Sequence, residues 1–379
     1  MSFHPDIAFA LAKCSSLSDA LHCMVNLGSQ EAVYCAVALM HNLFIPDFDD
    51  TPRAHIVTLA ASTVLNGSLK YGNAGEKESQ TVVNILVGIL KSLVNTTATP
   101  LLVGQLAVST LCNLALLPSF HSQLSIHAME PIITTLTSPR CNLDIKIDAV
   151  RFLYNLVTSA SCFESKSLAI DAGAVPGILS ILKLMTPEDN PTICLLGSIL
   201  VEISSVGSLN QRMVQEGVSK AIIRLAKVEI PSVKQDIARA FFRLCLSPDG
   251  ASRMLAMGDS VDALFWLTLH DCLGEFGPIL SNVSRTLKNL SLTSEDCVLL
   301  ANQDRLMNVL NVLSRCEKED ILWHTAAAIF NMLKVESIRH VLTKGGIVPI
   351  IFRLAGAGGG SGFVPVRFLC SASLHMIPG

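Results

Sequence analysis

The feature that most constrains the fold is a pattern that recurs along the chain at nearly constant intervals. Each copy begins with small and apolar residues at helical spacing and ends with one polar residue followed by an apolar one. The segments are CAVALMHNLF (35–44), LAVSTLCNLAL (106–116), DAVRFLYNLV (148–157), LLGSILVEIS (195–204), DIARAFFRLCL (236–246), NVSRTLKNLSL (282–292), HTAAAIFNMLK (324–334) and VRFLCSASLHM (366–376).

Aligning the segments places one polar residue of each in register, and we call this the ladder position. Its occupants are Asn42, Asn113, Asn155, Glu202, Arg243, Asn289, Asn331 and His375. The intervals between them are 71, 42, 47, 41, 46, 42 and 44 residues, so six of the seven lie between 41 and 47. Helical arrays with periods of about 40–47 residues are solenoids of two or three helices per repeat.

A second series of apolar helical segments precedes the first within each repeat. These segments are MEPIITTLTS (129–138), AVPGILSILKL (174–184), VSKAIIRLAKV (218–228), VDALFWLTLH (261–270), LMNVLNVLSR (306–315) and IVPIIFRLAG (347–356). Three of them follow a glycine, at Gly173, Gly217 and Gly346. Glycine suits the left-handed backbone of a sharp corner, so we expect a tight turn before these helices.

The combination resembles the armadillo repeat family. That family has a short helix, then acid-x-Gly-Gly/Ala-Ile/Val-Pro, an apolar helix, and a third helix ending in Ala-Leu-x-Asn-Leu. DAGAVPGILSILKL (171–184) and KGGIVPIIFRL (344–354) match the middle, while STLCNLA (109–115) and RFLYNLV (151–157) match the end. The resemblance covers about residues 15–379 and implies an all-α fold, a right-handed α-solenoid (superhelix) of about eight armadillo-like repeats.

The intervals predict three parts in the chain. Residues 1–46 form an N-terminal capping repeat, and residues 47–117 form an elongated or degenerate repeat. In the latter, a helix at 53–69 and a Gly-rich turn at 71–75 fill the excess length. Residues 118–379 form six consecutive armadillo-type repeats ending in a C-terminal cap.

The composition fits helices that bury one another. Hydrophobic residues make up 50% of the chain, charged residues 16%, and the mean hydropathy is +0.49, which excludes a disordered chain. Each repeat is apolar on too many sides to close its own core, so neighbouring repeats must cover it. The best candidate for a membrane span, 101–117, carries Gln105, Ser109 and Asn113 on one stripe. We therefore expect a buried helix there and no membrane span.

The cysteines and the N-terminus predict a cytoplasmic protein. The chain has 12 cysteines and no C-x-x-C, and Cys35, Cys112, Cys245 and Cys370 lie in apolar helical runs. Free cysteine in such runs behaves as a small hydrophobic residue, which suits a reducing compartment. The first residues carry no secretory signal, and Ser2 excludes N-myristoylation.

Enzymatic and nucleic-acid functions are not supported by the sequence. The net charge of −3 argues against nucleic-acid binding, and the chain contains no H-E-x-x-H, G-x-S-x-G or P-loop motif. His121 and His127 are six residues apart, a poor spacing for metal ligands on one helix. The glycine-rich run 356–362 lacks a following Lys-Ser/Thr, so we expect a surface loop. The prediction is a non-enzyme without cofactor, metal or small-molecule ligand.

A polar stripe on the third helices carries the candidate site. Residues four and seven or eight positions before the ladder residue share its helix face. In armadillo proteins this stripe lines the concave groove, where ladder asparagines clamp the backbone of an extended peptide. An amide can both donate and accept hydrogen bonds. The resemblance implies this role for Asn113, Asn155, Asn289 and Asn331, and fails where Glu202, Arg243 and His375 replace the amide. The alternative is that these asparagines only tie neighbouring repeats together.

Four arginines in the stripe indicate the charge of the ligand. Arg151, Arg239, Arg243 and Arg285 bias the groove toward an acidic segment, as in the β-catenin type of groove. Asp148 and Asp236, each three residues before an arginine, temper this bias by local neutralisation, and the alternative is an ordinary solvated charged face. Importin-α-like adaptors carry Trp four residues before the ladder Asn. Here no Trp stands at these positions, because Trp266 and Trp323 lie elsewhere.

Two functions remain at this stage. The first is a protein-interaction scaffold or adaptor that binds an extended acidic peptide in the groove. The alternative is a structural subunit of a cytoskeletal or axonemal, microtubule-associated assembly that contacts its neighbours through convex or end surfaces. In that case the protein is associated with the cytoskeleton or a flagellum.

Overall fold

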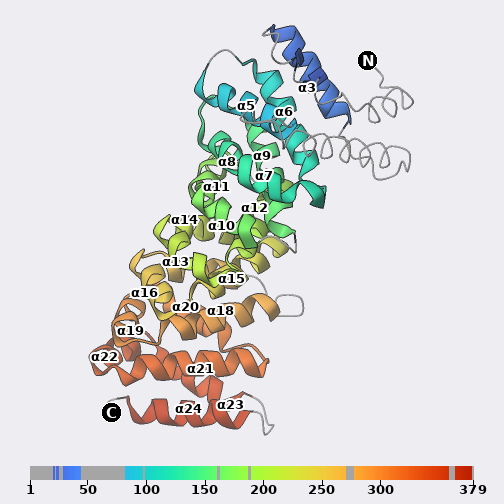
Figure 1. The fold of residues 1–379 in the computed structure, drawn as a ribbon. Helices are drawn as coiled ribbons and strands as arrows, with labels where there is room; N and C mark the ends of the chain where they lie inside the picture. Colours follow the sequence, from blue (N-terminus) through green and yellow to red (C-terminus); the bar gives the residue numbers. More distant parts are fainter. Residues whose placement is uncertain are drawn as a thin grey trace. The chain divides into compact units, whose positions relative to one another are not determined.

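The computed structural model describes most of the repeat region. The described residues are 20–21, 23–24, 29–43, 82–96, 99–159, 163–186, 189–269, 277–357 and 363–377. Within them the chain is entirely helical and turn-forming (Figure 1). The helix expected at 53–69 and the turn at 71–75 lie outside the described residues, as does most of the glycine-rich run. The chain divides into two compact units, Met1–Leu184 and Met185–Gly379.

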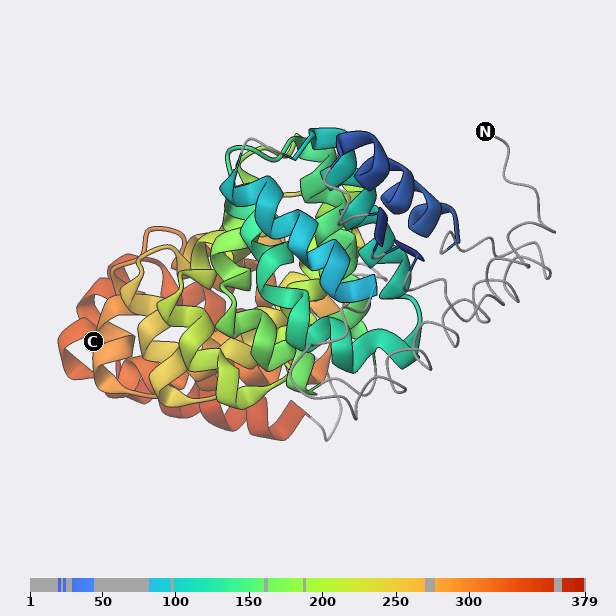
Figure 2. The same cartoon turned by 45° about the horizontal axis from the view of Figure 1, so that its top comes forward.

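Unit 1 contains three third helices, and one complete set of two short helices followed by a longer third helix spans 121–158. Its third helices are α3 (Gln30–Leu43), α6 (Leu101–Leu114) and α9 (Leu143–Thr158), and each contacts the next (Figure 2). The other helices are α5 (Val82–Asn95), α7 (His121–His127), α8 (Met129–Thr137), α10 (Phe163–Asp171) and α11 (Ala174–Leu182), with a short 3₁₀ helix at Pro118–Phe120. Among them α5, α8 and α11 form a second row, in which each helix contacts its neighbour.

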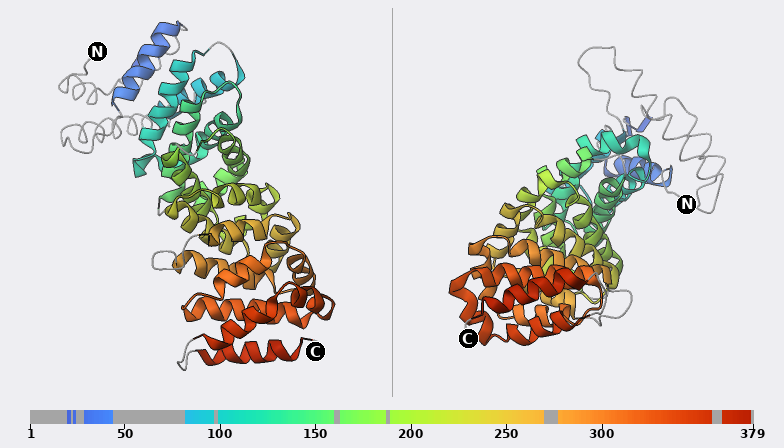
Figure 3. Two further views of the ribbon diagram at one scale, coloured as in Figure 1. Left: turned by 180° about the vertical axis from the view of Figure 1, so that it is seen from behind. Right: turned by 90° about the horizontal axis from the view of Figure 1, so that it is seen from below.

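Unit 2 continues the same pattern through five third helices. They are α12 (Asn190–Ile203), α15 (Pro231–Leu244), α18 (Gly277–Leu290), α21 (Glu319–Lys334) and α24 (Val364–His375). Each contacts the next, and α18, α21 and α24 lie side by side (Figures 1 and 3). The second row is α14 (Val218–Ala226), α17 (Ser260–Thr268), α20 (Leu306–Leu313) and α23 (Ile347–Gly356). The first helices are α13 (Gly207–Gln215), α16 (Pro248–Ala256), α19 (Ser294–Ala301) and α22 (Arg339–Lys344), the last preceded by a 3₁₀ turn at Glu336–Ile338.

Glycine corners separate the first helix from the second in several repeats. Gly173, Gly217 and Gly346 adopt φ values of 88°, 87° and 92°, which confirms the predicted left-handed turns. A further corner at Gly258, with φ 85°, was missed by the sequence reasoning because it has neither an acidic residue before it nor the glycine pair found at Gly346. Such φ values strain any residue with a Cβ, so glycine sets the angle at which the second helix leaves.

The burial pattern of the third helices confirms the sequence register. In α3, α6, α9, α12, α15, α18 and α21, the residues six, five and two positions before the ladder position, and the one after it, are all buried. In α9 these residues are Ala149, Val150, Leu153 and Leu156, each 0% exposed. This is the spacing of one helix face, and the ladder residue of each of these seven helices is half-buried, while His375 of α24 is exposed.

The length and composition of the described helices bear on whether the chain could span a membrane. None is by itself long and apolar enough, while two sharply bent pairs meet the criterion by length and composition alone. These pairs are Leu101–Leu114 with Pro118–His127, and Phe163–Asp171 with Ala174–Leu182.

The cysteines divide by environment. Cys112, Cys245 and Cys370 are buried in the helices where the sequence predicted small hydrophobic roles. Burial raises the pKa of the Cys112 thiol to about 12. Cys35 is exposed, contrary to the expectation for an apolar run, because its position on α3 faces away from the residues that α3 buries.

Candidate functional site

The eight predicted site residues share one side of the third helices. We call this side the third-helix face and define it by the ladder position and the residues one, four, seven, eight and eleven positions before it. Unit 1 brings together Asn113 on α6 with Arg151 and Asn155 on α9. Unit 2 brings together the other five on three consecutive third helices: Arg239 and Arg243 on α15, Arg285 and Asn289 on α18, and Asn331 on α21.

Two ladder residues bond to the preceding repeat. The Asn155 side-chain amide donates to the carbonyl of Cys112 on α6, at 3.3 Å, and the Arg243 guanidinium donates to the carbonyl of Val201 on α12. In both cases the acceptor lies one residue before the ladder position of the preceding repeat. This bond joins consecutive third helices.

The end of the preceding helix explains why these bonds form. The last carbonyls of a helix lack intrahelical partners. After α6, backbone N–H groups donate hydrogen bonds to the carbonyls of Leu111, Asn113 and Leu114, and none donates to the carbonyl of Cys112, which is thus passed over. After α12, the backbone N–H groups likewise pass over the carbonyl of Val201, which also accepts from the Ser204 hydroxyl. The ladder side chain of the next repeat supplies a donor to the carbonyl that was passed over.

The remaining ladder asparagines differ from one another. Asn331 donates to the Ser291 hydroxyl, at 3.3 Å, and so also contacts the preceding repeat. After α15 the N–H of Cys245 reaches the carbonyl of Phe242, so the equivalent acceptor is already filled one repeat before Asn289. The side chains of Asn113 and Asn289 make no hydrogen bond with the described residues. Asn155 and Asn331 therefore connect neighbouring repeats, as in the alternative interpretation of the ladder. Clamping of a peptide backbone remains a prediction for Asn113 and Asn289, whose amides have no bond with the described residues.

In unit 1 the predicted local neutralisation takes place. Arg151 Nη1 lies 2.9 Å from Asp148 Oδ1, with 55% of the arginine side chain and 14% of the aspartate side chain exposed. Burial raises the pKa of Asp148, although the neighbouring Arg151 acts in the opposite direction. Such an exposed pair contributes little to stability, and here it satisfies the charge of Arg151 within its own helix.

In unit 2 the arginines are less completely paired. Asp236 Oδ2 accepts from the Ser198 hydroxyl of α12, at 2.8 Å, and Arg239 makes no ion pair with a described carboxylate. Burial raises the pKa of Asp236. The pKa of the Arg243 guanidinium is lowered by burial and then by Arg239, which indicates that these two cations lie close together.

The next repeat adds cations placed over aromatic rings. The Arg285 guanidinium lies 5.9 Å from the ring centre of Phe242, and Lys288 Nζ lies 4.9 Å from that of Trp323. Arg285 Nη2 is 4.0 Å from Asp320 Oδ2, at the limit of an ion pair. Sequence reasoning missed Lys288, Phe242 and Trp323. The signal was available, because Phe242 and Lys288 directly precede ladder positions.

The histidines that were weighed as metal ligands have ordinary environments. His121 is buried, and its Nε2 lies 2.8 Å from the Ala115 carbonyl, while His127 is exposed. Among the residues described, no three His, Cys, Asp or Glu side chains are grouped so as to hold a metal ion.

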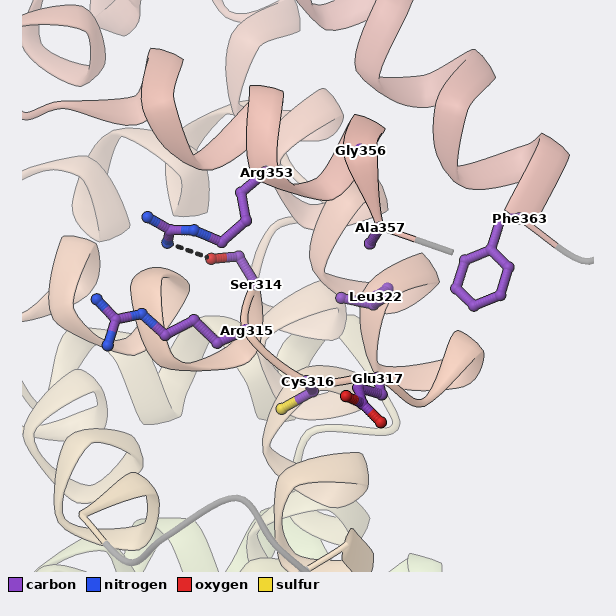
Figure 4. A pocket seen from close by; sticks show the side chains of 9 residues that line it. All are labelled: Ser314, Arg315, Cys316, Glu317, Leu322, Arg353, Gly356, Ala357 and Phe363. Carbon is purple, nitrogen blue, oxygen red and sulfur yellow. Dashed lines mark hydrogen bonds between the residues drawn. The ribbon is translucent and has the colours of Figure 1, made fainter. Parts of the chain in front are cut away.

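A pocket of about 620 Å³ lies in unit 2 between the ends of α20 and α23, and Leu322 of α21 and Phe363 also line it (Figure 4). Ser314, Arg315 and Arg353 lie on one side of it, and Phe363 lies on the opposite side. The Arg353 guanidinium already donates to Asn311 Oδ1, at 2.6 Å, and to the Ser314 hydroxyl, at 3.1 Å. The arginine thus serves to join α23 to α20, and the pocket contains no catalytic arrangement of side chains.

Comparison with known proteins finds similarity in structure and none in sequence. No protein-family model and no curated protein matches the sequence. An engineered protein of the Northeast Structural Genomics Consortium matches with a TM-score of 0.50 and 15% identity, over 99% of both chains. A computationally designed armadillo repeat protein for modular peptide recognition matches 66% of this chain and all of its own, with a TM-score of 0.48 and 16% identity. A designed armadillo repeat protein in complex with the peptide (KR)4 gives 0.47 and 16% over the same shares.

At these identities the similarity concerns the fold and carries no residue roles. The observed features are an all-α chain, three-helix repeats, sequential packing and glycine corners at the expected places. The chain has an all-α fold of helical repeats packed in sequence, and its match to the engineered protein extends over 99% of both chains.

Proposed function

We propose that the protein is a non-enzymatic interaction scaffold that binds an extended acidic segment of a partner protein on the third-helix face of unit 2. The observation that carries the proposal is the group of cations on the adjacent helices α15 and α18. It consists of Arg239, Arg243, Arg285 and Lys288.

The side chains of this group suit carboxylates. Arg239 has no ion-pair partner among the described residues, so its guanidinium can accept a carboxylate in bidentate geometry. Arg285 and Lys288 rest over aromatic rings, which limits their motion and keeps their charges at the surface. Asn289, whose amide makes no bond with the described residues, can donate to and accept from the backbone of a bound peptide.

The acidic residues nearby set a limit on the ligand. Burial lowers the pKa of Arg243, but the negative charges of Glu202 and Asp236 act in the opposite direction and partly offset its positive charge, and Asp320 lies beside Arg285. The third-helix face is therefore only moderately cationic. A ligand with a few spaced carboxylates fits this arrangement better than a long polyanion such as a nucleic acid. We extend the proposal to a cytoplasmic location, because the described cysteines are free thiols and several are buried.

The proposal is tested by peptide display on the full chain, followed by fluorescence anisotropy with the selected peptides. The wild-type chain should enrich peptides rich in Asp and Glu. The double variant Arg239→Glu/Arg285→Glu should weaken their binding at least tenfold, because it replaces two attractive charges with repulsive ones.

The matched control is Arg224→Glu on α14, an exposed arginine of the second row. It changes the charge of the protein in the same sense but lies outside the third-helix face. Equal losses in the control and in the Arg239/Arg285 variant would show that only net charge matters. Enrichment of basic or uncharged peptides would overturn the proposal.

The second candidate is a structural subunit of a cytoskeletal or axonemal assembly. The observation that favours it is the exposure of apolar side chains outside the third-helix face, at Phe352 on α23 and Val341 on α22. Co-sedimentation with microtubules, compared with gel filtration of the free chain, tests it. Sedimentation that survives Arg239→Glu/Arg285→Glu and is lost in Phe352→Asp would favour this candidate over peptide binding.

A further inference from the structure

The last third helix of unit 2 departs from the chemistry of the three third helices that directly precede it, although α12, like α24, carries an apolar residue, Leu195, seven positions before its ladder residue. Seven residues before the ladder position, α9, α15, α18 and α21 carry polar side chains: Asp148, Asp236, Asn282 and His324. At the same position α24 carries Phe368, of which 71% is exposed. One turn earlier, where α21 has Asp320, α24 has Val364, which is 59% exposed.

The register of α24 follows from its buried residues. Val366, Cys370 and Ser373 are buried, and 44 residues earlier Leu322, Ala326 and Ile329 are buried in α21. Phe368 therefore corresponds to His324, and Val364 corresponds to Asp320.

The equivalent residues of other repeats show which way this side of the helix faces. Asp236 accepts from Ser198 of the preceding third helix, and Asp320 accepts from Ser281, at 2.7 Å, of the helix before it. The pKa of His324 is lowered mainly by burial and in part by Arg285 and Lys288 of α18. By the same register, Phe368 and Val364 lie on the side of α24 that borders α21, on the third-helix face.

The third-helix face of unit 2 thus carries cations without large exposed apolar side chains on α15 and α18, whereas on α24 it carries the exposed apolar side chains of Phe368 and Val364 beside Arg367, Ser371 and His375. We propose that it recognises a bipartite peptide, in which acidic residues lie against Arg239 and Arg285 and one large apolar side chain packs on Phe368 and Val364. The inference rests on the proposed function and adds a second determinant to it. A single extended chain crossing the row contacts both ends, and the cationic end selects an acidic peptide over a second copy of this protein, whose net charge is only −3.

The helix spacing sets the distance between the two determinants. Packed helices lie about 8–10 Å apart, so two steps from α18 to α24 cover ~16–20 Å. An extended peptide advances about 3.3 Å per residue. The apolar residue should therefore lie about five or six positions from the acidic residue that meets Arg285.

The test uses fluorescein-labelled peptides and the full chain. Each peptide carries an Asp-Glu cluster and one Leu, placed six or two residues away, on the N-terminal or the C-terminal side. A companion set has Ser in place of Leu. One of the two peptides with six-residue spacing should bind about tenfold more tightly than its Ser companion, the gain expected from burying one Leu side chain. Phe368→Ala should remove that gain, whereas Phe352→Ala, which truncates another exposed Phe of the same repeat (62% exposed), should not.

The outcomes separate the inference from the proposed function. Acidic peptides that bind in an Arg239- and Arg285-dependent manner, with no difference between Leu and Ser or between Phe368→Ala and wild type, overturn the inference and leave the proposed function standing. Absence of any binding to acidic peptides overturns both. A change from dimer to monomer on Phe368→Ala, measured by light scattering, would assign the apolar end to a second copy and also overturn the inference.

Discussion

The bond between Asn155 and the Cys112 carbonyl gives the sharpest stability prediction. Asn155→Leu keeps the side-chain volume but removes the donor, and the backbone groups after α6 already serve other carbonyls. A typical hydrogen bond contributes about 0.5–1.5 kcal/mol net, and leaving a buried acceptor unpaired costs about 1–3 kcal/mol. Because Asn155 is half-buried and the bond is long, we expect a loss of ~1 kcal/mol.

Hydrogen exchange measured by mass spectrometry locates this loss. In a repeat array the contacts are between neighbours, so a local defect acts mainly on the repeats that it joins. A loss of ~1 kcal/mol should speed the exchange of protected amides in α6 and α9 about fivefold. Amides of α18 and α21 should exchange as in the wild type.

Asn289→Leu is the matched control. Its amide makes no hydrogen bond with the described residues, and the acceptor that corresponds to Cys112 is filled by Cys245. We expect a change within about 0.5 kcal/mol. Asn289→Leu should accelerate exchange in α15 and α18 less than Asn155→Leu does in α6 and α9 if a ladder side chain forms its bond only where the preceding helix leaves a carbonyl without a backbone donor. Equal acceleration would show that this explanation is wrong.

Two further predictions concern glycine and pH. Gly173→Ala should destabilise unit 1 by about 1 kcal/mol because Gly173 has a φ of 88°, although there is free space for a Cβ. Gly88→Ala, which also has free space but lies inside α5, should stabilise unit 1 by about 0.5–1 kcal/mol. Thermal unfolding followed by circular dichroism checks both, and a change of stability in the same direction for the two variants would contradict the strain argument. Burial raises the pKa of Asp236, so the folded protein favours the protonated form of this side chain. The contribution of the protonated form to stability is fully present below the ordinary pKa of about 3.9. It is lost as the pH rises through the raised pKa of the folded state. Asp236→Asn should therefore flatten the fall in stability above about pH 3.9, and an unchanged pH profile in urea unfolding would contradict this assignment.

Periodicity predicted the fold well because burial is a local requirement in a repeat array. The ladder alignment, made from residue types alone, places buried residues at the same four positions in seven third helices. The corners at Gly173, Gly217 and Gly346 were also predictable, since few residues other than glycine adopt φ near 90°. Gly258 escaped notice because it has neither an acidic residue before it nor a second glycine beside it.

The state of each ladder side chain could not be predicted, since it depends on how the preceding helix ends. Whether the carbonyl of Cys112 or Phe242 receives a backbone N–H is decided by the turn that follows α6 or α15. The same holds for charge pairing. Asp148 and Asp236 both stand three residues before an arginine, yet Asp148 pairs with Arg151, while Asp236 takes a serine hydroxyl from the neighbouring helix.

The neighbour-only bonding of the third helices has a mechanical consequence. Within each unit the main contacts join one repeat to the next, and the side-chain bonds of Asn155, Arg243 and Asn331 do the same. A pulling force applied to the two ends of a unit therefore loads these junctions in series. The weakest junction therefore separates first, and the unit extends under force in steps of one repeat.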